Sequence, residues 1–126
     1  YTKQFPEEKW VEFLLSLREK VKVYALGSDE DKPLCDRILS SAAYKRSENL
    51  AGRLSLLQSA ALMKDARRNL VNDSAPMHLA SAVNAKTTAI FCSTVTDFGF
   101  GPLSDDSIVA ETSLKLPCRA NTPIFI

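Results

Sequence analysis

The residues best suited to chemistry lie where a predicted strand gives way to a predicted helix. The strand ends at Asn72, and Pro76 opens the helix, because proline is favoured in a first helical turn. Asp73 and Ser74 lie between them, and His78 follows in the first turn. Free backbone N–H groups and the helix dipole attract anions there, and Ser74 and His78 could add donors. The pattern predicts an anion site suited to a phosphate or a sugar oxygen.

The same residue types also have ordinary structural roles. Asp73 or Ser74 could serve as a helix cap and nothing more, which is the commoner role at a helix start. His78 could pack against neighbouring side chains without binding a ligand. Lys3 precedes the first predicted helix and could hold a phosphate, and an acid in 29–31 could hold a ribose hydroxyl, although such charges are mostly solvated. The carboxylates show no spacing that nominates a general acid and base. Local chemistry therefore indicates a phosphate-binding site and fixes no reaction.

Alternating helices and strands must position these residues, and apolar periodicity predicts them. Helices are expected from Pro6 to about Lys20, from Pro33, from a cap at Ser55, and from Pro76 to Val83 with a left-handed stop at Asn84. Strands are expected at 21–26, 69–72, 87–91 and 108–111, with a further short strand near Tyr44. The third helix is expected to bury Leu56, Leu57, Ala60 and Met63.

Strands that alternate with helices favour right-handed crossovers and a parallel sheet with helices on both faces. We therefore predict one doubly wound α/β domain over residues 1–126. Ligands bind such sheets at the carboxyl ends of the strands. Thr2-Lys3, Gly27 to Asp31, and Asn72 to His78 fall at those ends.

Composition excludes several functional classes. The 16 Lys and Arg residues nearly balance the 15 Asp and Glu residues, so no basic field indicates a nucleic acid partner. No apolar run approaches the length of a membrane span, about 18 residues. Cys35, Cys92 and Cys118 are odd in number and widely spaced, which argues against disulfides and zinc and favours the cytoplasm. The single histidine excludes a His-rich metal cluster.

The two ends of the sequence suggest a longer protein. The chain opens at Tyr1 without a methionine, and it closes on an apolar stretch, 122–126, that a terminus rarely exposes. We expect both ends to be cut points.

Read together, the motifs resemble one enzyme family. The segment from Asn72 to Ala82 resembles the N-D-S/T-G-P-M-H-L-A-A-A motif of glycosyltransferase family 9, which includes the lipopolysaccharide heptosyltransferases. Residues 2–6 and Trp10 resemble its T-K-x-W-P segment with a downstream tryptophan, and residues 50–56 resemble its L-A-G-x-L-S/T-L segment. Residues 87–94 resemble its strand leading to F-G-P-T, and residues 101–104 resemble its G-P-L-S element. The matches are collinear and cover nearly the whole chain.

The resemblance implies the C-terminal half of a GT-B glycosyltransferase, with two facing Rossmann-like domains and a donor, typically ADP-heptose, bound without metal or cofactor. It implies that the diphosphate contacts Lys3 with help from Thr2, and that Leu54 lies against the base. Asp31 is the most plausible acid for the ribose. The phosphates or the transferred sugar would meet Asp73, Ser74 and Ala75, with His78 close by.

The implied reaction is inverting sugar transfer to an acceptor hydroxyl of a lipopolysaccharide core or related glycan. Lys3 and the helix terminus would stabilise the departing nucleoside diphosphate, and the general base would lie in the other domain. The fragment alone would bind nucleotide without turnover. We expect a cytoplasmic enzyme, with contact to the inner face of the membrane if its acceptor is lipid-linked.

Two departures from the family pattern bear on the donor. Ala75 replaces the usual glycine, and its methyl group would crowd a phosphate near the backbone. Cys92-Ser93 replaces the usual Gly-Pro. Alternatives are a GT-B relative that uses a UDP-sugar, including a sugar-nucleotide epimerase, and a non-catalytic Rossmann-like module that binds a protein.

Overall fold

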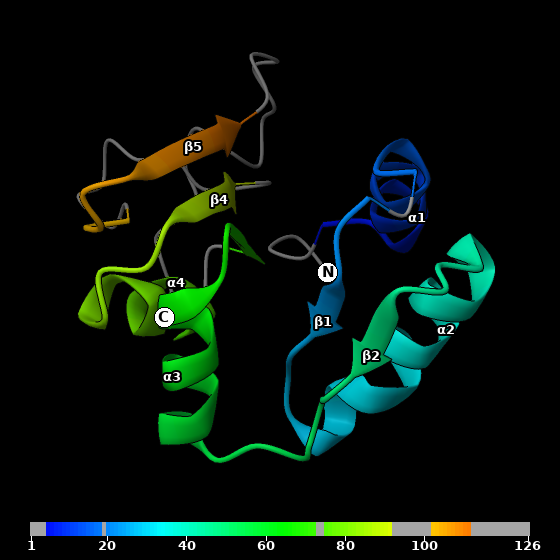
Figure 1. Cartoon of the computed structure of the whole chain (residues 1–126), viewed down its shortest axis with the longest axis horizontal. Coiled ribbons are helices and arrows are strands. Elements are labelled where there is room, and N and C mark those ends of the chain that lie inside the picture. Colours follow the sequence, from blue (N-terminus) through cyan, green and yellow to red (C-terminus); the bar gives the residue numbers. More distant parts are fainter. Residues whose placement is uncertain (1–4, 19, 73–74, 92–101, 112–126) are drawn as a thin grey trace, which may run out of the picture. The chain divides into compact units, whose positions relative to one another are not determined.

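The computed structural model describes residues 5–18, 20–72, 75–91 and 102–111 (Figure 1). Their contacts group into two compact units. The first unit is formed by residues 6–59, and the second by Phe5 with the described residues from Ala60 onward. All strand pairings among the described residues are parallel, and helices lie between successive strands in most of the chain. The predicted α/β fold with parallel strands is confirmed.

The first unit packs helices against a two-stranded sheet. It contains α1 (Glu7–Ser16), β1 (Val23–Ala25), the 3-10 helix η1 (Asp29–Asp31), α2 (Lys32–Ala42) and β2 (Ser47–Asn49). Figure 1 shows β1 and β2 side by side, and α2 contacts both β2 and α1. The buried core consists of Leu14, Ala42 and Tyr44, against which half-buried side chains of α1, α2 and β1 pack. This core fixes α2 on the sheet.

Two boundaries in this unit differ from the sequence prediction. Helix α1 ends at Ser16 rather than near Lys20, because Arg18 adopts a left-handed backbone with φ 51°. The short strand expected near Tyr44 was wrongly placed, since β2 begins at Ser47. Tyr44 instead has a side chain only 5% exposed, and its hydroxyl donates a 2.8 Å hydrogen bond to the Val21 carbonyl. Tyr44 therefore contributes to the core of this unit and not to a strand.

Helix α3 (Leu56–Asp65) spans the boundary between the units, and its cap is the one expected from the sequence. The Gln58 N–H donates to Ser55 Oγ at 3.2 Å, and the Ser55 N–H donates to Gln58 Oε1 at 2.8 Å. This reciprocal pair satisfies two free donors at the helix start. The expected burial of Leu56 and Leu57 is wrong, since they are 71% and 82% exposed. Burial begins one turn later, at Ala60.

The second unit holds a three-stranded parallel sheet in the order β3-β4-β5. Its elements after α3 are β3 (Asn69–Asn72), α4 (Ala75–Ala82), β4 (Thr87–Phe91) and β5 (Ser107–Glu111). Figure 1 shows β4 between β3 and β5. Alternate residues of β3 and β4 are buried, and α4 contacts both strands through a side that buries Met77 and Ala80. The bounds of β3 and β4 agree with the sequence prediction.

Hydrogen bonds tie the segment before β5 to the end of α4. The Leu103 N–H donates to Ser81 Oγ at 2.9 Å. Asn84 and Asp105 exchange two bonds, in which the Asp105 N–H donates to Asn84 Oδ1 at 2.9 Å and Asn84 Nδ2 donates to Asp105 Oδ2 at 3.0 Å. Asn84 has φ 52°, the left-handed stop expected from the sequence. These contacts lie at the amino-terminal edge of the sheet.

Among the described residues, no helix has both the length and the apolar character needed to cross a membrane.

Candidate functional site

The loops that follow β1 and β2 run side by side. Beyond the strands themselves, the Leu50 N–H donates to the Ala25 carbonyl and the Gly52 N–H donates to the Gly27 carbonyl, each at 2.9 Å. The parallel pairing therefore continues into both loops. Asp31 and Leu54, predicted to contact ribose and base, follow these bonded positions on the two loops. Both residues belong to the carboxyl ends of neighbouring strands, where parallel sheets bind ligands.

The Asp31 carboxylate organises the loop after β1. Its Oδ2 accepts hydrogen bonds from the Ser28 N–H at 2.8 Å and from Ser28 Oγ at 2.9 Å. The segment is thus a capped turn of 3-10 helix that leads directly into α2. Both of these bonds use Oδ2. The structure therefore shows a local structural role for Asp31, which the sequence did not predict.

Asn49, the last residue of β2, organises the site and was not predicted from the sequence. Its Nδ2 donates to the Lys32 carbonyl at 3.1 Å and to Asp36 Oδ1 at 2.7 Å, and its Oδ1 accepts from the Ala51 N–H at 3.0 Å. One amide therefore joins the loop after β2 to the start of α2. The available signal was an asparagine near the end of a short polar segment, a residue type that often bonds nearby backbone.

Leu54 ends the same loop immediately before the Ser55 cap of α3. Its side chain is half-buried, so part of its apolar surface faces solvent. Arg53 beside it is exposed and pairs with Glu48 of β2 at 3.3 Å. A partly open leucine next to a fixed helix start can form an apolar wall for a ring.

Cys35 lies one helical turn after Asp31 on α2. Partial burial raises the pKa of its thiol, and the nearby carboxylates of Asp31 and Asp36 raise that pKa further. The physical cause is that burial and negative charge both disfavour the thiolate. The pKa of the Cys35 thiol therefore responds to the charge at Asp31.

The end of β3 is joined to the start of the chain. The Phe5 N–H donates to Asn72 Oδ1 at 3.2 Å. Ala75 and His78 are both exposed in the first turn of α4. The predicted site residues Thr2, Lys3, Asp73 and Ser74 lie outside the described residues. The bond between Phe5 and Asn72 nevertheless joins the residues that flank them in the sequence, Phe5 after Thr2-Lys3 and Asn72 before Asp73-Ser74.

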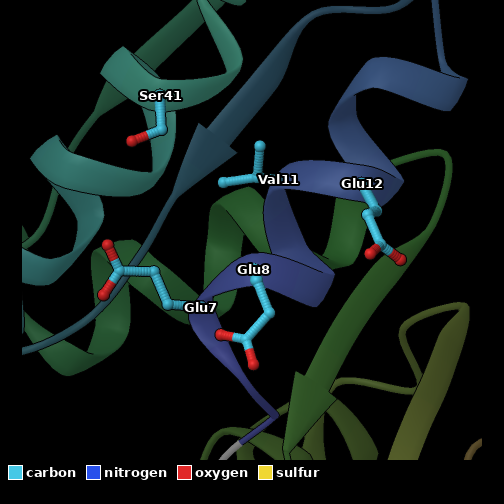
Figure 2. A pocket seen from close by; sticks show the side chains of 5 residues that line it. All are labelled: Glu7, Glu8, Val11, Glu12 and Ser41. Atoms are coloured by element: carbon cyan, nitrogen blue, oxygen red, sulfur yellow. The ribbon is translucent and has the colours of Figure 1, made fainter.

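A hollow of about 520 Å³ lies between α1 and α2. Figure 2 shows its lining, formed by Glu7, Glu8, Val11 and Glu12 of α1 and Ser41 of α2. Three carboxylates give it the wrong charge for a diphosphate. Ser41 is also ten residues along α2 from Asp31, about 15 Å for an α-helix. The hollow is therefore separate from the loops described above.

Within the part of the chain that the structure describes, no three His, Cys, Asp or Glu side chains gather as a metal-binding group. The absence of a metal or cofactor in the reaction stays a prediction.

A family model described as glycosyltransferase family 9 (heptosyltransferase) matches residues 1–125. The chain belongs to glycosyltransferase family 9. The predicted resemblance is therefore confirmed over nearly the whole sequence.

Solved structures agree with membership of glycosyltransferase family 9. The Escherichia coli ADP-heptose lipopolysaccharide heptosyltransferase II has a TM-score of 0.76 and 29% sequence identity, over 86% of this chain and 34% of that one. A family 9 glycosyltransferase from Veillonella parvula has a TM-score of 0.78 and 22% identity, over 91% and 33%. The E. coli heptosyltransferase WaaC with ADP has a TM-score of 0.73 and 22% identity, over 87% and 34%. No curated protein sequence matches this chain.

These neighbours have the GT-B fold, and the chain spans about a third of the length of each. The family's G-P-L-S element can now be placed in part. Leu103 and Ser104 lie at the amino-terminal edge of the β3-β4-β5 sheet, where they bond to α4. The resemblance alone did not show that this element is structural.

Proposed function

We propose that this chain binds the nucleotide-sugar donor of a family 9 glycosyltransferase, with ADP-heptose as the donor. The observation that carries the proposal is the paired continuation of β1 and β2 through Gly27 and Gly52, which puts Asp31 and Leu54 on adjoining loops. A carboxylate and an apolar side chain are the groups that a ribose and a base require. The names of two neighbours, an ADP-heptose enzyme and a heptosyltransferase with ADP, favour adenine as the base.

In this proposal Asp31 receives a ribose hydroxyl on Oδ1, since its Oδ2 already accepts both Ser28 bonds. Leu54 packs against the base. We assign the diphosphate to the start of α4, as the family motif implies, because free backbone N–H groups there favour negative charge. Ala75 and His78 lie in that first turn, and Asp73 and Ser74 directly precede it in the sequence.

The proposed chemistry is inverting transfer of the sugar to a hydroxyl of a lipopolysaccharide core or related glycan. The leaving nucleoside diphosphate gains negative charge as the glycosidic bond breaks, so a cation and a helix terminus lower the barrier. We assign the cation to Lys3, with Thr2 as an additional donor. The general base is assigned to a part of the enzyme outside this chain, so the chain binds nucleotide without turnover. We place the enzyme in the cytoplasm, against the membrane if its acceptor is lipid-linked.

Calorimetric titration of the chain with ADP, UDP and GDP tests the proposal. Saturable binding with ADP preferred is expected, and Asp31→Asn should weaken it, because the amide keeps an acceptor for Ser28 but loses the charge. Glu8→Gln, an exposed carboxylate of the hollow in Figure 2, is the matched control and should leave affinity unchanged. A preference for UDP or GDP would replace ADP-heptose as the donor. Absence of binding at millimolar concentrations of all three nucleotides would contradict the proposal.

A further inference from the structure

Two glycines make room for the two outer acids of the turn after β1. A Cβ atom added to Gly27 would lie 2.7 Å from Asp31 Cβ and 2.8 Å from Asp31 Oδ2. Both distances are shorter than real contacts between such atoms. Because Asp31 Cβ is fixed to the backbone, the clash could be relieved only by moving Asp31 or the Gly27 loop.

Gly52 plays the corresponding part for Asp29. Its backbone has φ 73°, in the left-handed region that favours glycine. A Cβ there would overlap Asp29 Oδ1 and approach the Asp29 backbone Cα to 3.0 Å. The Gly52 N–H also donates to the Gly27 carbonyl at 2.9 Å. The two glycines are therefore bonded to each other, and each lies against one acid.

Gly27 is the more informative of the two. Its φ is not in the left-handed region, so the φ of this position does not by itself require glycine. What excludes a side chain at this position is the space that Asp31 occupies. Position 27 therefore requires glycine because the Asp31 side chain lies where a Cβ would be.

We infer that Gly27 is a positioning residue for ribose recognition, which sets the Asp31 carboxylate so that the site prefers a ribonucleotide to one without ribose hydroxyls. This inference rests on the proposed function. Gly27 leaves space for the Asp31 side chain next to the loop after β1. Ser28 fixes that side chain by donating two hydrogen bonds to Asp31 Oδ2. Gly52 keeps the neighbouring loop in register, so that Asp31 and Leu54 act on the same nucleoside.

The test compares ADP with 2′,3′-dideoxy-ADP by calorimetry. Wild-type chain should bind ADP about tenfold or more tightly than the dideoxy compound, as expected for hydrogen bonds to a charged group. Gly27→Ala should bring this ratio close to one by weakening ADP binding alone. Ala42→Gly, a destabilising change in the buried end of α2, controls for loss of stability and should keep the wild-type ratio.

A ligand-free double-mutant cycle supplies the second arm. Gly27→Ala should lower Tm in the wild-type background and lower it less in an Asp31→Gly background, where no Cβ remains to clash. An equal loss of Tm in both backgrounds would overturn the positioning role. So would a wild-type ratio in a folded Gly27→Ala variant. If wild type fails to bind ADP at all, the proposed function fails instead, and the cycle separates that result from a failure of the inference.

Discussion

The backbone N–H of Phe5 donates to the side-chain oxygen of Asn72 at 3.2 Å, across 67 residues of sequence. Asn72 ends β3, and Phe5 follows the Thr2-Lys3 segment. One amide side chain therefore connects the two parts of the chain for which we predict phosphate contacts. This is a tertiary contact that neither segment reveals by itself.

Replacing Asn72 tests whether that connection serves binding. Asn72→Ala removes the acceptor for Phe5 and should lower the free energy of unfolding by about 1 kcal/mol. It should also weaken ADP binding about fivefold, because Phe5, which follows the predicted Thr2-Lys3 segment in the sequence, loses its hydrogen bond to the end of β3. Asn72→Asp keeps an acceptor oxygen and should retain more of the stability. Denaturant unfolding and calorimetry measure both effects, and lost stability with unchanged affinity would limit Asn72 to folding.

Ala75 departs from the family glycine at the first residue of α4. Ala75→Gly removes a methyl group from the terminus where we propose that phosphate binds, and should tighten ADP binding severalfold. Stability should fall by up to about 1 kcal/mol, because glycine is a poorer helix former. Ala82→Gly, at the last residue of the same helix, is the control for the loss of helix propensity. Equal ADP affinity in wild type and Ala75→Gly would show that the methyl group does not crowd the ligand.

The pKa of the Cys35 thiol lies above its ordinary value of 9.0 through burial, then through Asp31 and Asp36. Asp31→Asn should bring that pKa down and increase the alkylation rate at pH 8.5, because thiolate is the reactive form. Cys92→Ser and Cys118→Ser should be present so that only Cys35 reacts. A rate unaffected by Asp31→Asn would contradict the proximity of the two side chains.

The same shift gives a stability prediction. Because the folded-state pKa of Cys35 is raised, the contribution of its neutral thiol is fully present below the ordinary value of 9.0. It is lost as the pH rises through the folded-state pKa. Cys35→Ala should therefore reduce the loss of stability above pH 9 in denaturant unfolding, relative to wild type at each pH.

Replacing Arg68 tests whether the amino-terminal edge of the β3-β4-β5 sheet contributes to stability and not to ADP binding. Its Nη1 donates to Asp106 Oδ1 at 3.0 Å and to the carbonyls of Thr87 and Asp106 at 3.4 Å, at the amino-terminal ends of the strands. Arg68→Ala should lower the free energy of unfolding by about 1 kcal/mol, since the pair is partly exposed. ADP affinity should not change. Arg67→Ala removes the same charge from an exposed neighbour and should alter neither quantity.

Local signals predicted those elements whose boundaries depend on local chemistry. The β-branched run of β4, the cap at Ser55 and the left-handed Asn84 are all found as expected. Elements decided by packing were less predictable, as Tyr44 shows by entering the core instead of a strand. The pairing of the described strands into two sheets also depends on contacts that periodicity does not encode.

In the candidate site too, features set by local sequence were predicted and features set by tertiary contacts were not. Sequence and resemblance predicted Asp31 and Leu54, and the structure adds that their loops are bonded through Gly27 and Gly52. They did not predict that Asp31 also caps its own turn, because that depends on the conformation of Ser28. They did not single out Asn49, and they named Asn72 as a strand end without its bond to Phe5, because the partners of both side chains are distant in sequence.

The most direct test of donor binding is calorimetric titration of ADP into wild type, Lys3→Ala and Lys9→Ala. Both substitutions remove one lysine charge, but Lys9 lies on the exposed side of α1 in an ion pair with Glu12. We predict that Lys3→Ala weakens ADP binding by about tenfold or more, as for loss of a charged contact to phosphate, whereas Lys9→Ala binds as wild type does. Equal ADP affinity in all three proteins would contradict the assignment of Lys3 to the donor diphosphate and, with it, the proposed site.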